Sequence, residues 1–144
     1  MVPGIIADAA TPAQRARHLG PLLDGTRIGF FGLTEPNVGS DAAGVELAAC
    51  EDGDHVRLTG TKTLITNGTI ARTGIVIARL TDVGPTAFIV DRDESPFAAR
   101  ALEKMGNLAT PLAELSFEEA RVPRANLLGE PGKGLRLALK GDRK

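Results

Sequence analysis

The 144-residue sequence contains no tryptophan or tyrosine, one cysteine and two histidines. The single cysteine, Cys50, excludes an internal disulfide, so we expect a reducing location such as the cytoplasm. Its expected role is that of a small apolar side chain in a strand. The two histidines, His18 and His55, are far apart and form no ligand cluster with Cys50. We therefore predict no metal site and expect both histidines to be solvated.

Charge bias and long apolar runs are also absent. Seventeen Lys and Arg residues nearly balance eighteen Asp and Glu residues, for a net charge of −1. This balance removes the electrostatic argument for nucleic-acid binding. The longest apolar runs, such as "GIVIA" at 74–78, are too short to span a bilayer, and no secretory signal is visible. We expect one globular domain that binds neither nucleic acid nor membranes.

Short apolar or alternating segments, separated by turn signals, make up most of the chain. "EDGDH" at 51–55 predicts a hairpin between two of them. Closely spaced strands with little intervening helix favour a mainly β fold: an antiparallel barrel or sandwich of about seven or eight strands, with short helical segments at both ends. The expected strands lie within 26–33, 44–50, 55–66, 73–80, 86–90, 97–104 and 112–117.

The two ends of the sequence carry the helical signals. Residues 1–10 are poorly patterned and predict a loose terminus. Thr11, Pro12 and Gln14 match a capped helix start, which Gly20-Pro21 should interrupt and Gly25 should end. The expected division is 1–25 as the end of a helical region, 26–128 as a β-domain, and 129–144 as a linker and the truncated start of a helix.

The segment "LTEPNVGSDAAG" at 33–44 is the first candidate binding motif. Asn37 and Gly39 can adopt left-handed conformations, so the loop could turn several N–H groups towards one point. Thr34 and Ser40 would add hydroxyls beside that point. The alternative is a plain turn in which Ser and Asp side chains cap their own backbone.

The segment "GTKTLITNG" at 60–68 is the second candidate. Thr66 and Asn67 precede Gly68 at a strand end, where backbone groups are free to meet a ligand. The alternative is an edge strand whose threonines reflect β-propensity. No catalytic set is evident, because the adjacent Glu118 and Glu119 should point to opposite faces of a strand.

A third segment, "LAELSFEEARVPRANLLGEPGKG" at 112–134, follows these two. Together, in their order and spacing, the three resemble the middle β-domain of the acyl-CoA dehydrogenase family. The segment at 11–26 also resembles the last helix of that family's N-terminal helical domain. The resemblance covers about residues 11–139.

The resemblance implies FAD as cofactor and an acyl-CoA or acyl-carrier-protein thioester as substrate, which the parent enzyme desaturates between its α and β carbons. Leu33 and Thr34 would meet the pyrimidine side of the flavin, and Thr66 would lie near N5 and O4. "GFFGL" at 29–33 could supply an apolar wall. The implied flavin contacts are Leu33, Thr34, Leu64 and Thr66, and the implied thioester contacts are Gly39 and Ser40. Ser40 would face either the pantetheine arm of the thioester or the pyrophosphate edge of the flavin.

The sequence also departs from the family pattern. Leu64 stands where the family usually has an aromatic residue that covers the flavin, and Leu108 stands where many members have arginine. The family's catalytic glutamate lies on a C-terminal helical domain, so we predict no catalytic residue: none of Glu35, Glu46, Glu114 or Glu118 should be the base.

We therefore expect this chain alone to dehydrogenate nothing. In the parent enzyme the resemblance implies a homo-oligomer, whose neighbouring subunit helps to clamp the flavin, and an electron-accepting flavoprotein. Two alternatives stay open: a non-catalytic binding module derived from this domain, and part of a related flavin oxidase or monooxygenase.

Overall fold

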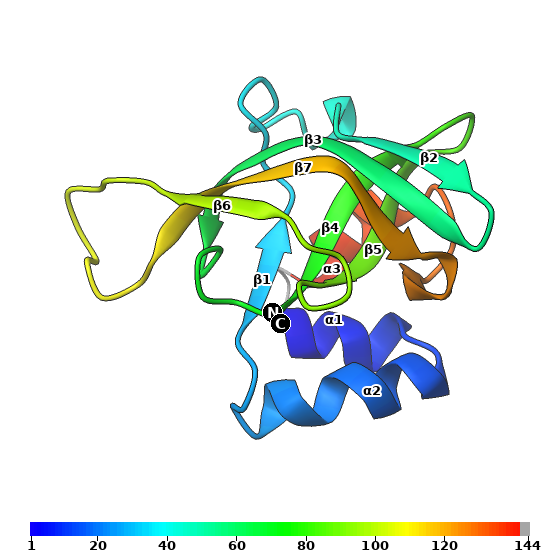
Figure 1. Ribbon diagram of the computed structural model, residues 1–144, viewed down its shortest axis with the longest axis horizontal. Helices are drawn as coiled ribbons and strands as arrows, with labels where there is room; N and C mark the ends of the chain where they lie inside the picture. Colours follow the sequence, from blue (N-terminus) through cyan, green and yellow to red (C-terminus); the bar gives the residue numbers. More distant parts are fainter. Residues whose placement is uncertain (142–144) are drawn as a thin grey trace.

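The computed structural model describes residues 1–141 and has a mainly β fold with helices near both ends, as predicted (Figure 1). Two helices, α1 (Val2–Ala9) and α2 (Pro12–Leu23), precede the sheet, and α3 (Gly134–Gly141) follows it. The strands are β1 (Gly29–Gly32), β2 (Ala48–Asp52), β3 (His55–Thr66), β4 (Thr73–Leu80), β5 (Gly84–Asp91), β6 (Ala98–Ala101), β7 (Leu112–Pro123) and β8 (Leu127–Leu128). Short 3-10 helices span Ala42–Gly44 and Arg124–Asn126.

The eight strands form one mixed sheet in the order β6-β7-β3-β2-β4-β5-β8, with β1 also paired to β4. Most pairs are antiparallel, including the predicted β2–β3 hairpin. However, β1 and β2 both run parallel to β4, and β6 and β8 end the sheet, so it is not the closed antiparallel barrel that was one of our expectations. β1 pairs with residues 73–76 of β4, and β2 pairs with residues 79–80 of the same strand. The 33–44 loop therefore leaves the sheet between β1 and β2, which both pair with β4.

The sheet bends into two layers with an apolar core on each side of β4. Its sequence "TGIVIARL" is almost continuously buried, as expected for a strand covered on both faces. Val76 and Ala78 face the core enclosed by the sheet, whereas Ile75 and Ile77 face a second core shared with α1. Figure 1 shows β3, β6 and β7 as one layer, with α1 and α2 outside the other.

The N-terminal ten residues were expected to be loose, and that prediction was wrong. They form α1, because Val2, Ile5 and Ile6 bury their side chains in the second core. An apolar helical face is stable only when another surface covers it, and the isolated segment gives no sign of that surface.

The capped start of α2 is confirmed, with Thr11 Oγ1 3.2 Å from Gln14 N and Gln14 Oε1 2.9 Å from Thr11 N. Gln14 Nε2 also donates to the carbonyls of Ala125 and Leu127, each at 2.8 Å, and so ties the helix to the second 3-10 helix and the start of β8. Pro21 does not interrupt the helix, which continues to Leu23. Its missing N–H costs the helix one hydrogen bond, and the helix ends two residues later.

Two side-chain environments differ from expectation. His18 is 2% exposed rather than solvated, because it lies on the buried face of α2 together with Gln14, and desolvation lowers the pKa of its imidazole. Cys50 does lie in a strand, but it is exposed rather than packed as an apolar residue. Among the described helices, none is both long and apolar enough to cross a membrane.

Candidate functional site

The first motif begins with a segment held against β3 by its carbonyl groups. Thr34 O accepts from Thr63 N at 2.9 Å, and Leu33 O accepts from Lys62 Nζ, also at 2.9 Å. The chain then reverses through a bridge between Glu35 and Val38, whose N–H and carbonyl groups pair at 3.0 and 3.1 Å. The first motif is therefore anchored to the second at its base.

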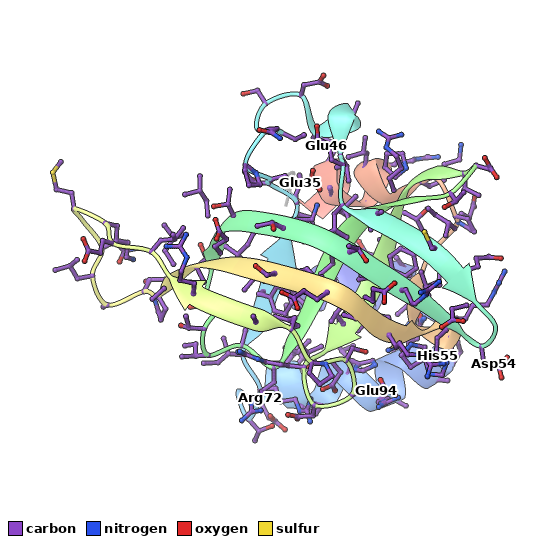
Figure 2. The ribbon with its side chains drawn as sticks, turned by 45° about the horizontal axis from the view of Figure 1, so that its top comes forward. Glu35, Glu46, Asp54, His55, Arg72 and Glu94 are labelled. Atoms are coloured by element: carbon purple, nitrogen blue, oxygen red, sulfur yellow. The ribbon has the colours of Figure 1, made fainter. Side chains whose placement is uncertain are left out.

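A buried ion pair lies under this base. Lys62 Nζ is 2.7 Å from Glu35 Oε1, and the two side chains are 0% and 2% exposed. The Glu35 carboxylate also accepts from Glu46 N at 2.7 Å and from Leu47 N at 2.9 Å. Figure 2 shows Glu35 and Glu46 close together where the loop leaves the sheet, away from the charged groups labelled at the other end. Both carboxylate oxygens are thus occupied by donors.

Burial changes the protonation balance of the lysine. Desolvation lowers the pKa of Lys62, and the hydrogen bond and the negative charge of Glu35 oppose that change. The aliphatic part of the Lys62 side chain packs beside β1. Its Cγ would lie 3.5 Å from a Cβ added to Gly32, the last residue of that strand. Lys62 therefore connects β1, β3 and the loop base through one side chain.

The carbonyls of this segment point inwards, and that fixes the direction of the neighbouring N–H. All described peptide bonds are trans, so the Thr34 N–H points opposite to the Leu33 carbonyl and away from Lys62. Among the described residues, neither the Thr34 N–H nor its hydroxyl donates a hydrogen bond. Thr34 is half-buried, so it offers two donors at the surface beside β3.

The tip of the loop is placed differently. Gly39 and Ser40 are exposed, and no hydrogen bond joins them to Thr34 in the described chain. Asn37 Nδ2 lies 3.3 Å from Glu46 Oε2, and the 3-10 turn closes through Gly44 N and Asp41 O at 3.0 Å. Neither Asn37 nor Gly39 adopts positive φ, so the loop does not use the left-handed conformations that its sequence allows.

The second motif contains the left-handed residues instead. The β3–β7 register shifts between Lys62 and Ile65, and within this bulge Leu64 has φ 57° and is 59% exposed. Asn67 has φ 64°. Its N–H donates to Pro111 O at 2.8 Å, and Gly68 N donates to Ile65 O at 3.2 Å. The expectation of free backbone groups at this strand end is therefore wrong for these two amides.

Thr66 lies beside a hollow of about 370 Å³ between β1, β3 and α1, within the size range of small-molecule sites. Phe31 is half-buried there, whereas Phe30 is 1% exposed and belongs mainly to the enclosed core, in edge-to-face contact with Phe97. The hollow is lined by Met1, Val2, Pro3, Leu22, Gly29, Phe30, Phe31, Thr66 and Asn67.

The structure thus places the four predicted flavin contacts on two neighbouring segments, residues 33–34 and 64–66. Leu33 and Thr34 lie beside Lys62 and Thr63, and Thr66 follows three residues further along β3. Leu64 lies between them and points outwards. Gly39 and Ser40 sit apart, at the loop tip.

Lys62 is the residue that the sequence interpretation missed. Its signal was the alternation of β3: Val56 and Leu58 are buried, and counting by two places Lys62 on the same face. A lysine on a core-facing position requires a buried partner, and Glu35 was available. Glu114, considered and rejected as a base, pairs with Arg100 at 3.0 Å, and Leu108 is 77% exposed on the loop between β6 and β7.

Comparison with known proteins agrees with this geometry. Residues 30–120 match the family model described as "Acyl-CoA dehydrogenase, middle domain". The chain belongs to the acyl-CoA dehydrogenase family. The short-chain specific acyl-CoA dehydrogenase of Clostridium acetobutylicum is 38% identical over 142 residues, which cover 94% of this chain and 37% of that protein. The chain thus spans little more than a third of that relative's length.

Solved structures of this family superpose closely on the fold. Butyryl-CoA dehydrogenase from Megasphaera elsdenii is 40% identical with a TM-score of 0.91, over 96% of this chain and 38% of that one. An acyl-CoA dehydrogenase from Bacillus anthracis, solved in complex with FAD, is 35% identical with a TM-score of 0.89, over 94% of this chain and 24% of that one. The two motifs of this chain therefore lie on a fold that it shares with an enzyme solved in complex with FAD.

Proposed function

We propose that this chain is the part of an acyl-CoA (or acyl-carrier-protein) dehydrogenase that contacts FAD and the acyl thioester, within the division 1–25, 26–128 and 129–144. The observation that carries this proposal is the pair of outward donors on Thr34, held beside β3 by carbonyls that face inwards. A flavin ring needs directional donors along one edge and an apolar wall. This surface offers both.

The dimensions of the surface fit an extended ring. Thr63 is bonded to Thr34, and Thr66 lies three residues beyond it, at most roughly 10 Å away because the bulge at Leu64 shortens the segment. We place Leu33 and Thr34 at the pyrimidine side, Leu64 over the ring and Thr66 at the N5 edge, with Phe31 in the wall. Bound there, FAD would accept the hydride from the β-carbon of the thioester.

The chain's own groups bind and orient in this proposal. The Thr34 N–H and hydroxyl favour negative charge at the pyrimidine edge, which preorganised donors stabilise most strongly where water is excluded. Gly39 and Ser40, on the exposed tip, are placed to meet the acyl-thioester arm. Glu35 is not a base, because Lys62 and two backbone amides occupy its oxygens.

The proposal includes no proton-abstracting group on this chain, so the isolated chain should not desaturate a thioester. Catalysis would need the remaining two thirds of a protein of the relatives' length, an electron-accepting flavoprotein and, for the flavin clamp, a second subunit. The single cysteine favours a cytoplasmic location.

Titration of the purified chain with FAD, followed by calorimetry and flavin fluorescence, tests the proposal. We expect saturable binding at one site per chain. No binding by a chain shown to be folded by circular dichroism would mean that the β-domain is only a scaffold, and the proposed site would be wrong.

Leu64→Trp tests the placement of the ring. An indole at this exposed position would stack on the flavin, so FAD affinity or the flavin absorption spectrum should change. The matched control is Leu108→Trp, which puts the same group at another exposed position, on the loop between β6 and β7. An unchanged affinity and spectrum for Leu64→Trp would contradict the placement of Leu64 at the ring.

A further inference from the structure

General physical principles do not require a buried ion pair such as Glu35–Lys62 for the stability of a fold. Removing two charges from water is expensive, and buried ion pairs can often be replaced by apolar side chains without loss of stability. The pair is nevertheless fully enclosed, with Lys62 0% exposed. What the pair provides is directional bonding that no apolar replacement would supply.

That bonding converges on the loop base. Lys62 Nζ holds the Leu33 carbonyl at 2.9 Å and the Glu35 carboxylate at 2.7 Å. The same carboxylate holds two backbone amides just before β2, Glu46 N and Leu47 N. One charged pair therefore ties together both ends of the loop that leaves the sheet between β1 and β2.

The orientation of Thr34 follows from this arrangement. Because Lys62 holds the Leu33 carbonyl inwards, the trans peptide turns the Thr34 N–H outwards. Within the described chain, the Leu33 carbonyl has no other partner in the hydrogen bonds outside the strands. Without the ammonium group of Lys62, the peptide between Leu33 and Thr34 could therefore rotate. Lys62 therefore acts on the ligand surface without touching it.

We propose that Glu35 and Lys62 are positioning residues for the flavin: they set the direction of the Thr34 N–H and thereby the affinity for FAD and the absorption spectrum of the bound flavin. This inference rests on the proposed function. It assigns to two buried residues a role in cofactor binding that neither performs by contact.

The test uses the 144-residue chain, the single variant Lys62→Met and the double variant Glu35→Gln/Lys62→Met. Methionine keeps an unbranched side chain, and the double variant leaves no unpaired buried charge, so it should stay folded even if the single variant does not. We expect a Kd for FAD about tenfold or more above that of the wild type, as for the loss of an oriented hydrogen bond. The bound flavin's absorption maxima should also shift.

A second readout needs no ligand. In ¹H–¹⁵N spectra of the apo chain, the chemical shift of the Thr34 amide should change in the double variant, because the peptide that carries it reorients. The Asn67 amide, bonded to Pro111 O, should not change. A role confined to global stability would move both amides, whereas the positioning role moves the first.

The matched control is Arg27→Met/Asp91→Asn. It removes another ion pair, with a 2.7 Å contact and Asp91 side chain 7% exposed, at the opposite end of β1 from Leu33. The Kd of this control for FAD should stay within twofold of the wild-type value, and the spectrum of the bound flavin should not shift. Both expectations hold whatever the melting temperature of the control.

The outcomes separate the two proposals. If the wild-type chain does not bind FAD, the proposed function fails and the inference falls with it. If wild type and the folded double variant bind FAD with equal affinity and identical spectra, the inference alone is wrong. Weaker binding with a shifted spectrum in the double variant, and neither in the control, supports it.

Discussion

The two motifs of the candidate site are held in place by opposite means. The 33–44 loop has no residue with positive φ, and besides the backbone bonds at Thr34 and between Glu35 and Val38 it is held by the buried side chains of Glu35 and Lys62. The 60–68 segment is fixed by backbone hydrogen bonds and includes two non-glycine residues with positive φ, Leu64 and Asn67. The difference predicts that loss of charge disrupts the first motif, whereas a change of backbone freedom or Cβ volume disrupts the second.

The largest effect should come from Glu35→Ala. It leaves Lys62 charged and unpaired in the interior and removes the acceptor of two buried amides. We expect a loss of about 3–5 kcal/mol in the free energy of unfolding, measured by urea denaturation.

Glu46→Ala is the matched control for this change, because Glu46 lies next to the same site but is exposed, and within residues 1–141 its side chain is bonded only to Asn37. Its expected effect is within about 0.5 kcal/mol. Equal destabilisation by the two substitutions would show that the loop is not held by its buried carboxylate.

Gly68→Ala should have the next largest effect, and acts on the second motif. A Cβ at this position would lie 2.8 Å from Ala113 Cβ and 2.9 Å from Leu115 Cδ2. Both atoms belong to buried side chains of β7, so the strand must shift, at an expected loss of about 1–3 kcal/mol. Gly39→Ala is the control, since a Cβ there meets nothing within 4 Å. A thermal melt that moves equally for both would contradict close packing at Gly68.

Elements whose signals are local were predicted well from the sequence. The apolar run of β4 gave its bounds, and the Thr11–Gln14 capping box marked the start of α2. The resemblance to a family depended likewise on short segments in order. These features need no knowledge of distant residues.

The features that sequence interpretation missed depend on distant partners. The helix α1 forms because a core formed by β4 and β5 covers it. The parallel pairing of β1 with β4 joins segments about forty residues apart, and no local pattern specifies its direction.

Leu64 shows why the site was only partly predictable. Alternation along β3 would place it on the same face as Lys62, but one extra residue in the bulge turns it outwards. Prediction of Lys62 as buried required alternation alone, whereas prediction of Leu64 as exposed required the register against β7.

Leu64→Gly should have a smaller effect, of opposite sign. Left-handed φ costs a branched side chain about 1–2 kcal/mol, and glycine loses about 0.5–1 kcal/mol through its freer unfolded chain. Leu64 is 59% exposed, so little burial is lost. We expect a net stabilisation of about 0.5 kcal/mol, measured by chemical denaturation. Thr63→Gly, at a residue without positive φ, should instead destabilise. Destabilisation by Leu64→Gly would mean that its side chain contributes more than its backbone strain removes.

The smallest effect on stability should come from Ser40→Ala at the loop tip. Ser40 is exposed and far from the buried pair along the loop, so the free energy of unfolding should change by less than about 0.5 kcal/mol. If the hydroxyl meets the thioester arm, affinity of the FAD-loaded chain for an acyl-CoA should fall about two- to tenfold, as for one neutral hydrogen bond. Affinity for FAD itself should stay unchanged, because the base of the loop remains anchored by Lys62. An equal loss of FAD affinity would mean that Ser40 contacts the cofactor. The tip of the loop would then take part in FAD binding, as we propose for Leu33 and Thr34 at its base.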